Sequence, residues 1–303
     1  GWAEHNAEAD WWANTCTVVA EVLARSGVAP TAVEAVGCSG IGPCVLPVDA
    51  DVNPLGPGIL YGIDTRAGTQ IERLNDDVIR LYLKLPEGER LQFLAGQYLN
   101  FILENGEKRA FSIANAPHDD AYIELHIRHV SGGTFTDFLF EGMQEKIIMR
   151  IEAPLGSYFL REDSDRPVIL MGGGTGFAPL KGIIEHAFAI GVERPMQLYW
   201  GVRSKQDLYL PELPMQWARE HSNFSYIPVL SEPNGDWQGR TGWVHDSVVQ
   251  DHADLRDYEV YMSGPPPMID AGKQAFLAHG LNEEHLFSDS FEYGALSKDT
   301  RQG

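Results

Sequence analysis

The segment PVILMGGGTGFAPLKGIIEHAFAI, residues 167–190, joins a strand-like apolar run to a helix-like run through four closely spaced glycines. A glycine-rich turn lets the main chain approach a pyrophosphate, and the amino end of the helix offers free amides. The turn is not the G-x-G-x-x-G fingerprint, because counting from Gly172 the third glycine position holds Phe177. Taken alone, it is equally compatible with a purely structural turn.

The rhythm of the chain changes at Arg166. After it, the strand-like runs PVILM, MQLYWGV and EVYMSG are each followed by a helical stretch, which predicts a doubly wound parallel sheet. Before it, DVIRLYLKL and YIELHIRHV alternate apolar and polar residues, and Asn105-Gly106 marks a hairpin turn between two further strands. This density of strands predicts a six-stranded antiparallel barrel over about 71–160.

The first 70 residues have a different character. Residues 7–27 have the periodicity of an amphipathic helix, with Gly27 placed to end it. The short apolar runs VEAVGCSG, PCVLPVDA and PGILYGID predict strands, with DADVNP as a turn between two of them. No lysine precedes Lys84, which is a modest sign of a boundary.

Composition narrows the possible partners. The formal charge of −20 argues against binding to nucleic acid or to an anionic membrane. We expect no membrane span, since no apolar run reaches 18 residues, and no secretion signal. The three cysteines, Cys16, Cys38 and Cys44, match no metal or iron–sulfur spacing, so we expect no metal and a reducing, cytoplasmic location. The chain begins with Gly1 and not with methionine, so we expect a missing or processed start.

Four further motifs are candidates for chemistry, and each has an ordinary structural alternative. RAFS (109–112) offers a cation, an aromatic ring and a hydroxyl on one strand, although a half-exposed strand is the commoner explanation. HIRHVSGGTFTDFLF (126–140) ends an alternating strand in Ser-Gly-Gly-Thr and starts a helix at about Thr136, which makes a second strand–turn–helix junction with free amides. YMSGPPPMID (261–270) is a strand end followed by a rigid turn, and SDSFEYG (288–294) places an aromatic ring late in the chain.

Together these motifs carry a resemblance. Residues 71–293 resemble the ferredoxin–NADP reductase superfamily, and within it the reductase subunits of oxygenases and of deoxysugar dehydrase systems, and NAD(P)H–flavin reductases. The strings that carry it are FLAGQYLNF, RAFSIANAP, LHIRHVSGGTFTDFLF, PLGSYFL, GGGTGFAPLKGIIEH, YWGVRSKQDLY, GRTGWVH and SGPPPMI.

The resemblance implies FAD in a cleft between barrel and sheet, and hydride transfer from a nicotinamide cofactor to it. It implies an FAD site made by Arg109, Ala110, Phe111, Ser112, His126, Ile127, Arg128, Gly132, Gly133, Thr134 and Thr136. It implies a nicotinamide-cofactor site made by Gly173, Gly174, Thr175, Gly176, Arg203, Asp207, Gly264 and Pro265. Ser112, Ser263 and Phe291 are the residues implied at the reacting centre: a hydrogen bond near the flavin, a residue near the nicotinamide, and a ring covering the flavin.

Two departures from the family matter. Relatives often carry cysteine where Ser263 stands, and many begin with a plant-type ferredoxin domain. We expect no iron–sulfur cluster here, so electrons would pass directly from FAD to an external protein, to free flavin or to dioxygen. Asp207 can take a ribose hydroxyl, which favours NADH, while Arg203 and Lys205 keep NADPH open.

Residues 1–68 resemble a fragment of the xylulokinase-type FGGY sugar kinases, with the region around Asp64, Thr65 and Arg66 near the sugar. The catalytic aspartate and the ATPase domain of that family are not found, so we expect no kinase activity. We place the junction within about 67–75 and interpret it as recombination or misassembly. The expected domains are a kinase-like segment over 1–70, the FAD barrel over 71–162, the NAD(P) domain over 163–295 and a tail over 296–303.

Three readings follow from the sequence: a flavin-dependent reductase with an inert amino-terminal segment, a sugar kinase with a fused module, and a non-enzymatic interaction domain or inactive chimera. The first is favoured, because the third leaves two converging anion-binding turns unexplained. A bound-flavin spectrum separates the three.

Overall fold

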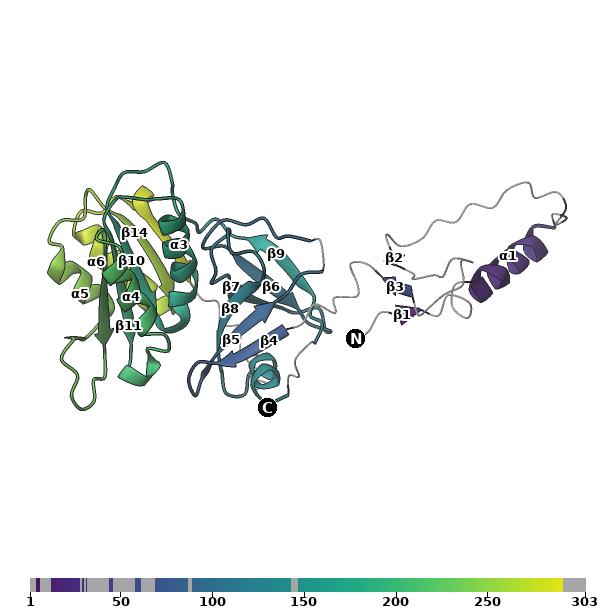
Figure 1. Ribbon diagram of the computed structural model, residues 1–303, viewed down its shortest axis with the longest axis horizontal. Helices are drawn as coiled ribbons and strands as arrows, with labels where there is room; N and C mark the ends of the chain where they lie inside the picture. Colours follow the sequence, from purple (N-terminus) through teal and green to yellow (C-terminus); the bar gives the residue numbers. More distant parts are fainter. Residues whose placement is uncertain are drawn as a thin grey trace, which may run out of the picture. The chain divides into compact units, whose positions relative to one another are not determined.

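The computed structural model divides the chain into two units, Gly1–Gly68 with Lys146–Ile148, and Thr69–Glu145 with Met149–Gly303 (Figure 1). The structure describes residues 4–5, 12–27, 29, 31, 44–45, 58–60, 69–86, 89–142 and 147–290.

The first unit contains one described helix and one small sheet. Helix α1 spans Ala13–Ser26, and Gly27 ends it in the left-handed conformation (φ 67°), as the sequence predicts. Strands β1 (Glu4–His5), β3 (Gly58–Leu60) and β2 (Cys44–Val45) form a three-stranded sheet in that order. The predicted strand in VEAVGCSG and the turn in DADVNP lie outside the described residues.

Helix α1 buries none of its residues, so little tertiary packing stabilises it. We therefore expect trypsin to cleave after Arg25, whose side chain is 83% exposed, before it cleaves after Lys181, whose side chain is 6% exposed. Mass spectrometry of a digestion time course checks this order. Cleavage at the two sites at equal rates would contradict it.

The second unit begins with an antiparallel lobe of six strands. Its strands are β4 (Thr69–Arg73), β5 (Val78–Leu83), β6 (Tyr98–Ile102), β7 (Lys108–Ser112), β8 (Ile123–Arg128) and β9 (Ile151–Leu155). They pair as two three-stranded sheets, β4-β5-β8 and β7-β6-β9, and the isolated bridge between Ile113 and Leu125 connects them. The predicted six-stranded barrel is therefore two antiparallel sheets around one apolar core.

The predicted hairpin and alternation are present in this lobe. The β6–β7 turn has Gly106 at φ 81°, a conformation that favours glycine. On β8, Ile123, Leu125 and Ile127 point into the core. After β8 the chain forms α2 (Thr134–Asp137) and a π-helical turn over Phe138–Gly142.

The parallel lobe follows, as the strand–helix alternation predicts. Its six-stranded parallel sheet has the order β13-β12-β11-β10-β14-β15. The strands are β10 (Val168–Gly173), β11 (Met196–Val202), β12 (Phe224–Leu230), β13 (Arg240–Thr241), β14 (Glu259–Gly264) and β15 (Leu286–Ser290). Helices α3 (Phe177–Ala189) and α4 (Glu212–Glu220) share one apolar core, and α5 (Val244–Asp251) and α6 (Pro266–Ala278) share another (Figure 1).

The two lobes share packing along α3. A single core cluster joins Val78 and Tyr158 of the antiparallel lobe to Ile183 of α3. A Cβ at Gly182 would come within 2.9 Å of the Asn115 carbonyl oxygen, so the helix approaches the main chain of the antiparallel lobe closely. Among the described residues, no helix is both long enough and apolar enough to cross a bilayer.

Candidate cofactor-binding site

The glycine-rich turn joins β10 to α3 in the parallel lobe. Residues Gly174–Gly176 form a single 3-10 turn, with Gly174 at φ 55°. A Cβ at Gly176 would overlap the main-chain carbonyl of Ser263, so only glycine fits there. The amides of this turn and the amino end of α3 form a site suited to an anion.

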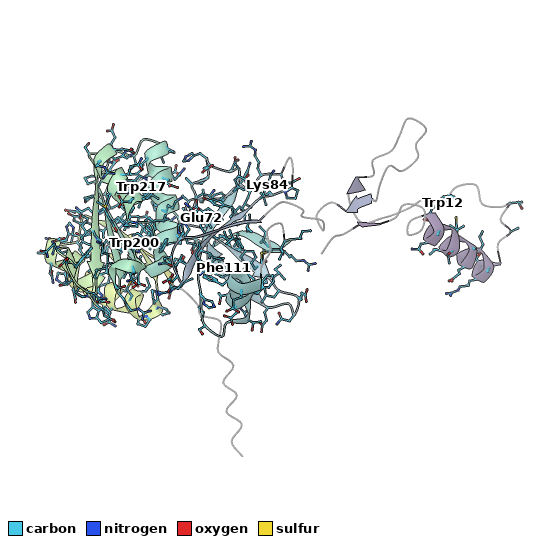
Figure 2. The ribbon with its side chains drawn as sticks, turned by 60° about the horizontal axis from the view of Figure 1, so that its bottom comes forward. Trp12, Glu72, Lys84, Phe111, Trp200 and Trp217 are labelled. Atoms are coloured by element: carbon cyan, nitrogen blue, oxygen red, sulfur yellow. The ribbon has the colours of Figure 1, made fainter. Side chains whose placement is uncertain are left out.

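Trp200 supports this turn from the neighbouring strand β11, deep in the parallel lobe (Figure 2). Its indole Nε1 donates to the Gly174 carbonyl oxygen at 2.9 Å, and its ring stacks on Phe177 with centroids 4.1 Å apart. Sequence reasoning did not identify this residue. The available signal was a tryptophan directly before Gly201, near the end of an apolar strand.

The Gly-Pro turn after β14 lies against the glycine-rich turn. A Cβ at Gly264 would lie 3.2 Å from the Cα of Gly173, and one at Gly173 would lie 3.1 Å from the Pro265 ring. Ser263, at the end of β14, is completely buried, and its hydroxyl has no hydrogen-bond partner among the described residues. The structure thus brings these predicted residues together.

Ser112 connects the antiparallel lobe to the same place. Its hydroxyl donates to Asp289 Oδ2 at 2.7 Å, and Asp289 on β15 is paired with Ser263 on β14. Burial raises the pKa of Asp289, and the hydrogen bond from Ser112 opposes that rise. The sequence did not single out Asp289, although it lies two residues before the predicted Phe291. Phe291 itself lies outside the described residues.

The other residues of RAFS have partners within the antiparallel lobe. The Arg109 guanidinium, 34% exposed, donates to Glu107 Oε2 at 2.6 Å. The half-buried Phe111, labelled in Figure 2, has a ring that meets Phe101 edge-on, with centroids 5.7 Å apart. It therefore already has an aromatic neighbour. Ala110 is exposed.

The second predicted anion turn follows β8. Gly132 has φ 78° with open space around it, and a Cβ at Gly133 would lie 2.9 Å from the Val130 carbonyl oxygen. Thr134 is exposed at the start of α2. The Thr136 hydroxyl is buried and donates to the Val130 carbonyl at 3.0 Å, so it holds the turn closed and is not turned toward a ligand.

The predicted residues on β8 differ from one another in surroundings. Ile127 is in the apolar core, and His126 is buried between Glu124 and Tyr209, so neither side chain is open to a cofactor. Arg128 is 33% exposed, and its guanidinium NH1 lies 3.6 Å from the Cβ position of Gly174. This cation of the antiparallel lobe therefore stands beside the glycine-rich turn of the parallel lobe.

The predicted residues after β11 form a short capped turn. Asp207 Oδ2 accepts hydrogen bonds from the amide and the hydroxyl of Ser204, at 2.8 and 3.0 Å. The Arg203 carbonyl accepts from the amide of Glu232 at 2.8 Å. A second carboxylate residue, which the sequence did not single out, therefore adjoins this turn.

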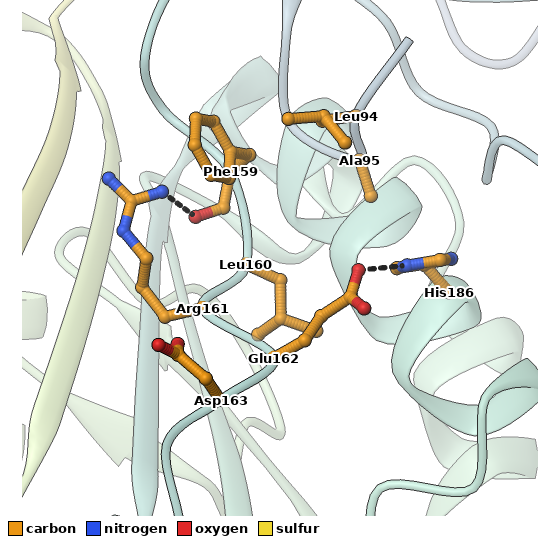
Figure 3. Close-up of a pocket in the computed structure, with 8 residues that line it drawn as sticks. All are labelled: Leu94, Ala95, Phe159, Leu160, Arg161, Glu162, Asp163 and His186. Atoms are coloured by element: carbon orange, nitrogen blue, oxygen red, sulfur yellow. Dashed lines mark hydrogen bonds and ion pairs between the residues drawn. The ribbon is translucent and has the colours of Figure 1, made fainter. Parts of the chain in front are cut away.

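A pocket of about 220 Å³ lies elsewhere on the second unit (Figure 3). Its lining includes Leu94, Leu160 and Arg161, and His186 Nε2 pairs there with Glu162 Oε1 at 2.9 Å. None of the predicted cofactor residues lines it. We assign it no role in the chemistry.

The described residues fit a flavin and a nicotinamide dinucleotide. Two glycine-dependent turns, one in each lobe, precede helices α3 and α2, and Arg128 is a cation beside the first of these turns. The buried Ser263 hydroxyl, which has no hydrogen-bond partner in the part of the chain that the structure describes, belongs to a residue that lies against the glycine-rich turn. No group of three or more potential metal ligands occurs among the described residues.

Comparisons with known proteins agree with this arrangement. Residues 69–159 match the oxidoreductase FAD-binding domain, and residues 170–274 match the oxidoreductase NAD-binding domain. The chain is 34% identical over 229 residues to the NAD(P)H-flavin reductase of Aliivibrio fischeri, covering 74% of this chain and 96% of that protein. It is 40% identical over 221 residues to the CDP-6-deoxy-L-threo-D-glycero-4-hexulose-3-dehydrase reductase of Yersinia pestis, covering 73% of this chain and 66% of that protein.

Among solved structures, the Amycolatopsis cytochrome P450 reductase GcoB superposes with a TM-score of 0.70 at 33% identity, covering 78% of this chain and 76% of that one. The chain spans slightly less than two thirds of the length of the dehydrase reductase, 66%. The predicted kinase-like segment precedes both matched domains and stays a prediction. The chain belongs to the ferredoxin–NADP reductase-type family of oxidoreductases, in which an FAD-binding domain precedes an NAD-binding domain.

Proposed function

We propose that the chain is an NAD(P)H-dependent flavoprotein reductase that passes electrons from FAD to an external acceptor. One observation carries this proposal: Ser112 of the antiparallel lobe reaches Asp289, which is paired with Ser263, and Ser263 touches Gly176 of the glycine-rich turn. A residue predicted at the flavin is thus joined through two residues to the turn predicted at the nicotinamide cofactor.

Each part of the site has a role in this proposal. When bound, FAD would accept a hydride from the dihydronicotinamide and would release electrons to the acceptor. Arg109 and Thr134 would hold phosphates on the antiparallel lobe, beside Gly133, whose amide donates to the Val130 carbonyl at 2.8 Å. The amides of Gly174–Gly176 would hold those of the nicotinamide cofactor.

Ser112 and Ser263 place hydroxyl groups at the junction, where a hydrogen bond orients the reacting rings. Arg128 lies beside the glycine-rich turn and adds positive charge for either pyrophosphate. Gly264 and Pro265 would form the wall of the nicotinamide side, while Phe291, predicted to cover the flavin, lies outside the described residues.

NADH is the preferred donor in this proposal. The Asp207 carboxylate accepts from Ser204 in the turn after β11, and the exposed Glu232 is bonded to the Arg203 carbonyl through its main-chain amide. The negative charges of these two residues would repel a second phosphate on the ribose. We expect the KM for NADPH to exceed that for NADH by about tenfold or more, and Glu232→Gln to narrow the ratio. Steady-state kinetics with both donors measures it, and equal KM values in the unaltered chain would contradict the preference.

The acceptor belongs to one of three classes: an iron–sulfur protein, an oxygenase component or free flavin. The relatives support this range, since they include an NAD(P)H-flavin reductase, the reductase of a hexulose dehydrase and the reductase component of a terephthalate dioxygenase. No observation on the described residues favours a sugar kinase, and Asp64, Thr65 and Arg66 lie outside those residues.

The proposal is tested by flavin binding and turnover. FAD added to the purified chain should bind at one equivalent, and the complex should oxidise NADH when ferricyanide or free riboflavin is supplied. A chain that binds FAD without oxidising either nicotinamide cofactor would exclude the reductase. ATP-dependent phosphorylation of a pentulose would instead support the kinase alternative.

A further inference from the structure

The polar face of strand β8 is directed toward the parallel lobe. Glu124, His126 and Arg128 alternate with the core residues of the strand, so they share its other face. Alternation of this kind usually marks a face turned to water. Here Glu124 and His126 are buried, and each of the three residues reaches a partner in the parallel lobe.

The strongest of these contacts is an ion pair at α3. Lys181 Nζ lies 3.1 Å from Glu124 Oε2, and the side chains are only 6% and 7% exposed. Lys181 also donates to the carbonyl of Ala114 at 3.3 Å and to Glu185 at 2.9 Å. Burial favours protonation of Glu124, but the hydrogen bond from His126 and the charge of Lys181 outweigh it and lower the pKa of this carboxyl.

Two further contacts join β8 to the parallel lobe. Together with the Glu124–Lys181 pair they form a row of contacts between the two lobes, which we call the seam. His126 bonds Glu124 Oε1 through Nε2 at 2.8 Å and Tyr209 through Nδ1 at 3.0 Å. Burial lowers the pKa of His126, so the neutral ring donates to Glu124 and accepts from the Tyr209 hydroxyl. Arg128 lies 3.7 Å from Asp207, which places the end of the seam beside the glycine-rich turn.

The position of Lys181 makes this seam relevant to the chemistry. Lys181 follows Gly176 by five residues, so it is little more than one turn into the helix that the glycine-rich turn begins. Gly182, the next residue, lets the helix lie close to the Asn115 carbonyl. The helix is therefore fixed against the antiparallel lobe at its first turns, where any displacement would be passed directly to Gly174–Gly176.

We propose that Glu124 and Lys181 form a positioning pair that sets the glycine-rich turn at reacting distance from the flavin strand carrying Ser112. The inference rests on the proposed function, because it concerns the geometry of the same hydride transfer. A buried ion pair contributes little net stability compared with a well-packed apolar pair, but it specifies one arrangement of the groups it joins. Its expected consequence is therefore on rate more than on folding.

The experiment compares four chains as FAD complexes under anaerobic conditions. They are the unaltered chain, Lys181→Met, the double variant Glu124→Gln/Lys181→Met, and Glu259→Gln. Glu259 forms an equally buried pair with Arg194 at 2.8 Å, within the parallel lobe and at the opposite end of β14 from Ser263, so it is the matched control. Stopped flow gives the limiting rate of flavin reduction and the NADH concentration at half-maximal rate, and thermal unfolding gives Tm.

We expect Lys181→Met to lower the limiting rate on the order of 10-fold to 100-fold, as a displacement of about 1 Å would. The NADH concentration at half-maximal rate should change by less than about threefold, since the phosphate-binding amides are retained. The double variant removes both charges of the Glu124–Lys181 pair and leaves only Glu185, 26% exposed, without its Lys181 partner. It should therefore regain most of the Tm that Lys181→Met loses, while its limiting rate stays low. Glu259→Gln should lose Tm and keep its limiting rate.

A limiting rate in the double variant within about twofold of the unaltered chain would overturn the positioning role, because only structural stability would then depend on the pair. The double variant decides the matter even where Lys181→Met alone does not fold. Failure of the proposed function looks different: the unaltered FAD complex would not be reduced by NADH at all.

Discussion

Gly176→Ala is expected to lower the rate of nicotinamide-dependent flavin reduction by on the order of 100-fold or more. A Cβ at this position would overlap the Ser263 carbonyl, which is rigid main chain at the end of β14. Either the turn moves away from the Gly-Pro segment or the two strands β10 and β14 separate at their ends. Both changes displace the amides that would hold the nicotinamide cofactor, while the antiparallel lobe keeps its FAD.

Anaerobic stopped flow with NADH measures this loss, and FAD absorbance after gel filtration shows whether flavin is retained. Gly191→Ala is the matched control, since Gly191 follows the other end of α3 and a Cβ there meets nothing within 4 Å. Because Gly191 has a φ of 73°, Gly191→Ala should lower the free energy of unfolding by about 1 kcal/mol. It should leave the rate of flavin reduction unchanged. Unchanged reduction in Gly176→Ala would show that the turn is not part of the site.

Ser112→Ala is expected to lower the limiting rate of flavin reduction by about 100-fold while FAD binding is retained. The Ser112 hydroxyl is the hydrogen-bond donor that connects β7 to Asp289. Its loss removes an orienting group at the junction and leaves the Asp289 carboxyl without that donor. Because the Ser112 bond lowers the pKa of Asp289, the variant should raise this pKa further.

The pH dependence of the limiting rate separates this effect from a general loss of activity. If ionised Asp289 supports reduction, the acidic limb of the profile should move to higher pH in Ser112→Ala. Ser225→Ala, at an exposed position on β12, is the control and should leave both rate and profile unchanged. A Ser112→Ala chain that reduces flavin at the unaltered rate would remove Ser112 from the reacting centre.

Local patterns in the sequence predicted most of the architecture. The parallel strands β10, β11 and β14, the helix after the glycine-rich turn and the hairpin at Asn105-Gly106 follow from periodicity and turn residues, which are properties of neighbouring positions. The barrel was less well predicted, because its six strands close as two sheets. Which strands pair depends on contacts between distant residues.

The site shows the same division. Glycines at 173, 174 and 176 were identified because their turn is local, and Ser112 because its strand follows a hairpin. Trp200 and Asp289 were missed, since each acts on a residue far away in the sequence. The polar face of β8 was misleading for a physical reason: alternation shows that one face is polar, but not whether that face meets water, a cofactor or another lobe.

Anaerobic titration of the FAD-loaded chain with NADH tests the central claim most directly, because it requires both turns and the junction at Ser112 to act together. One equivalent of NADH should bleach the visible absorbance of one equivalent of bound FAD, and Gly176→Ala should not bleach on the same timescale. Stable FAD binding without bleaching by NADH or NADPH, or no uptake of FAD at all, would contradict the account.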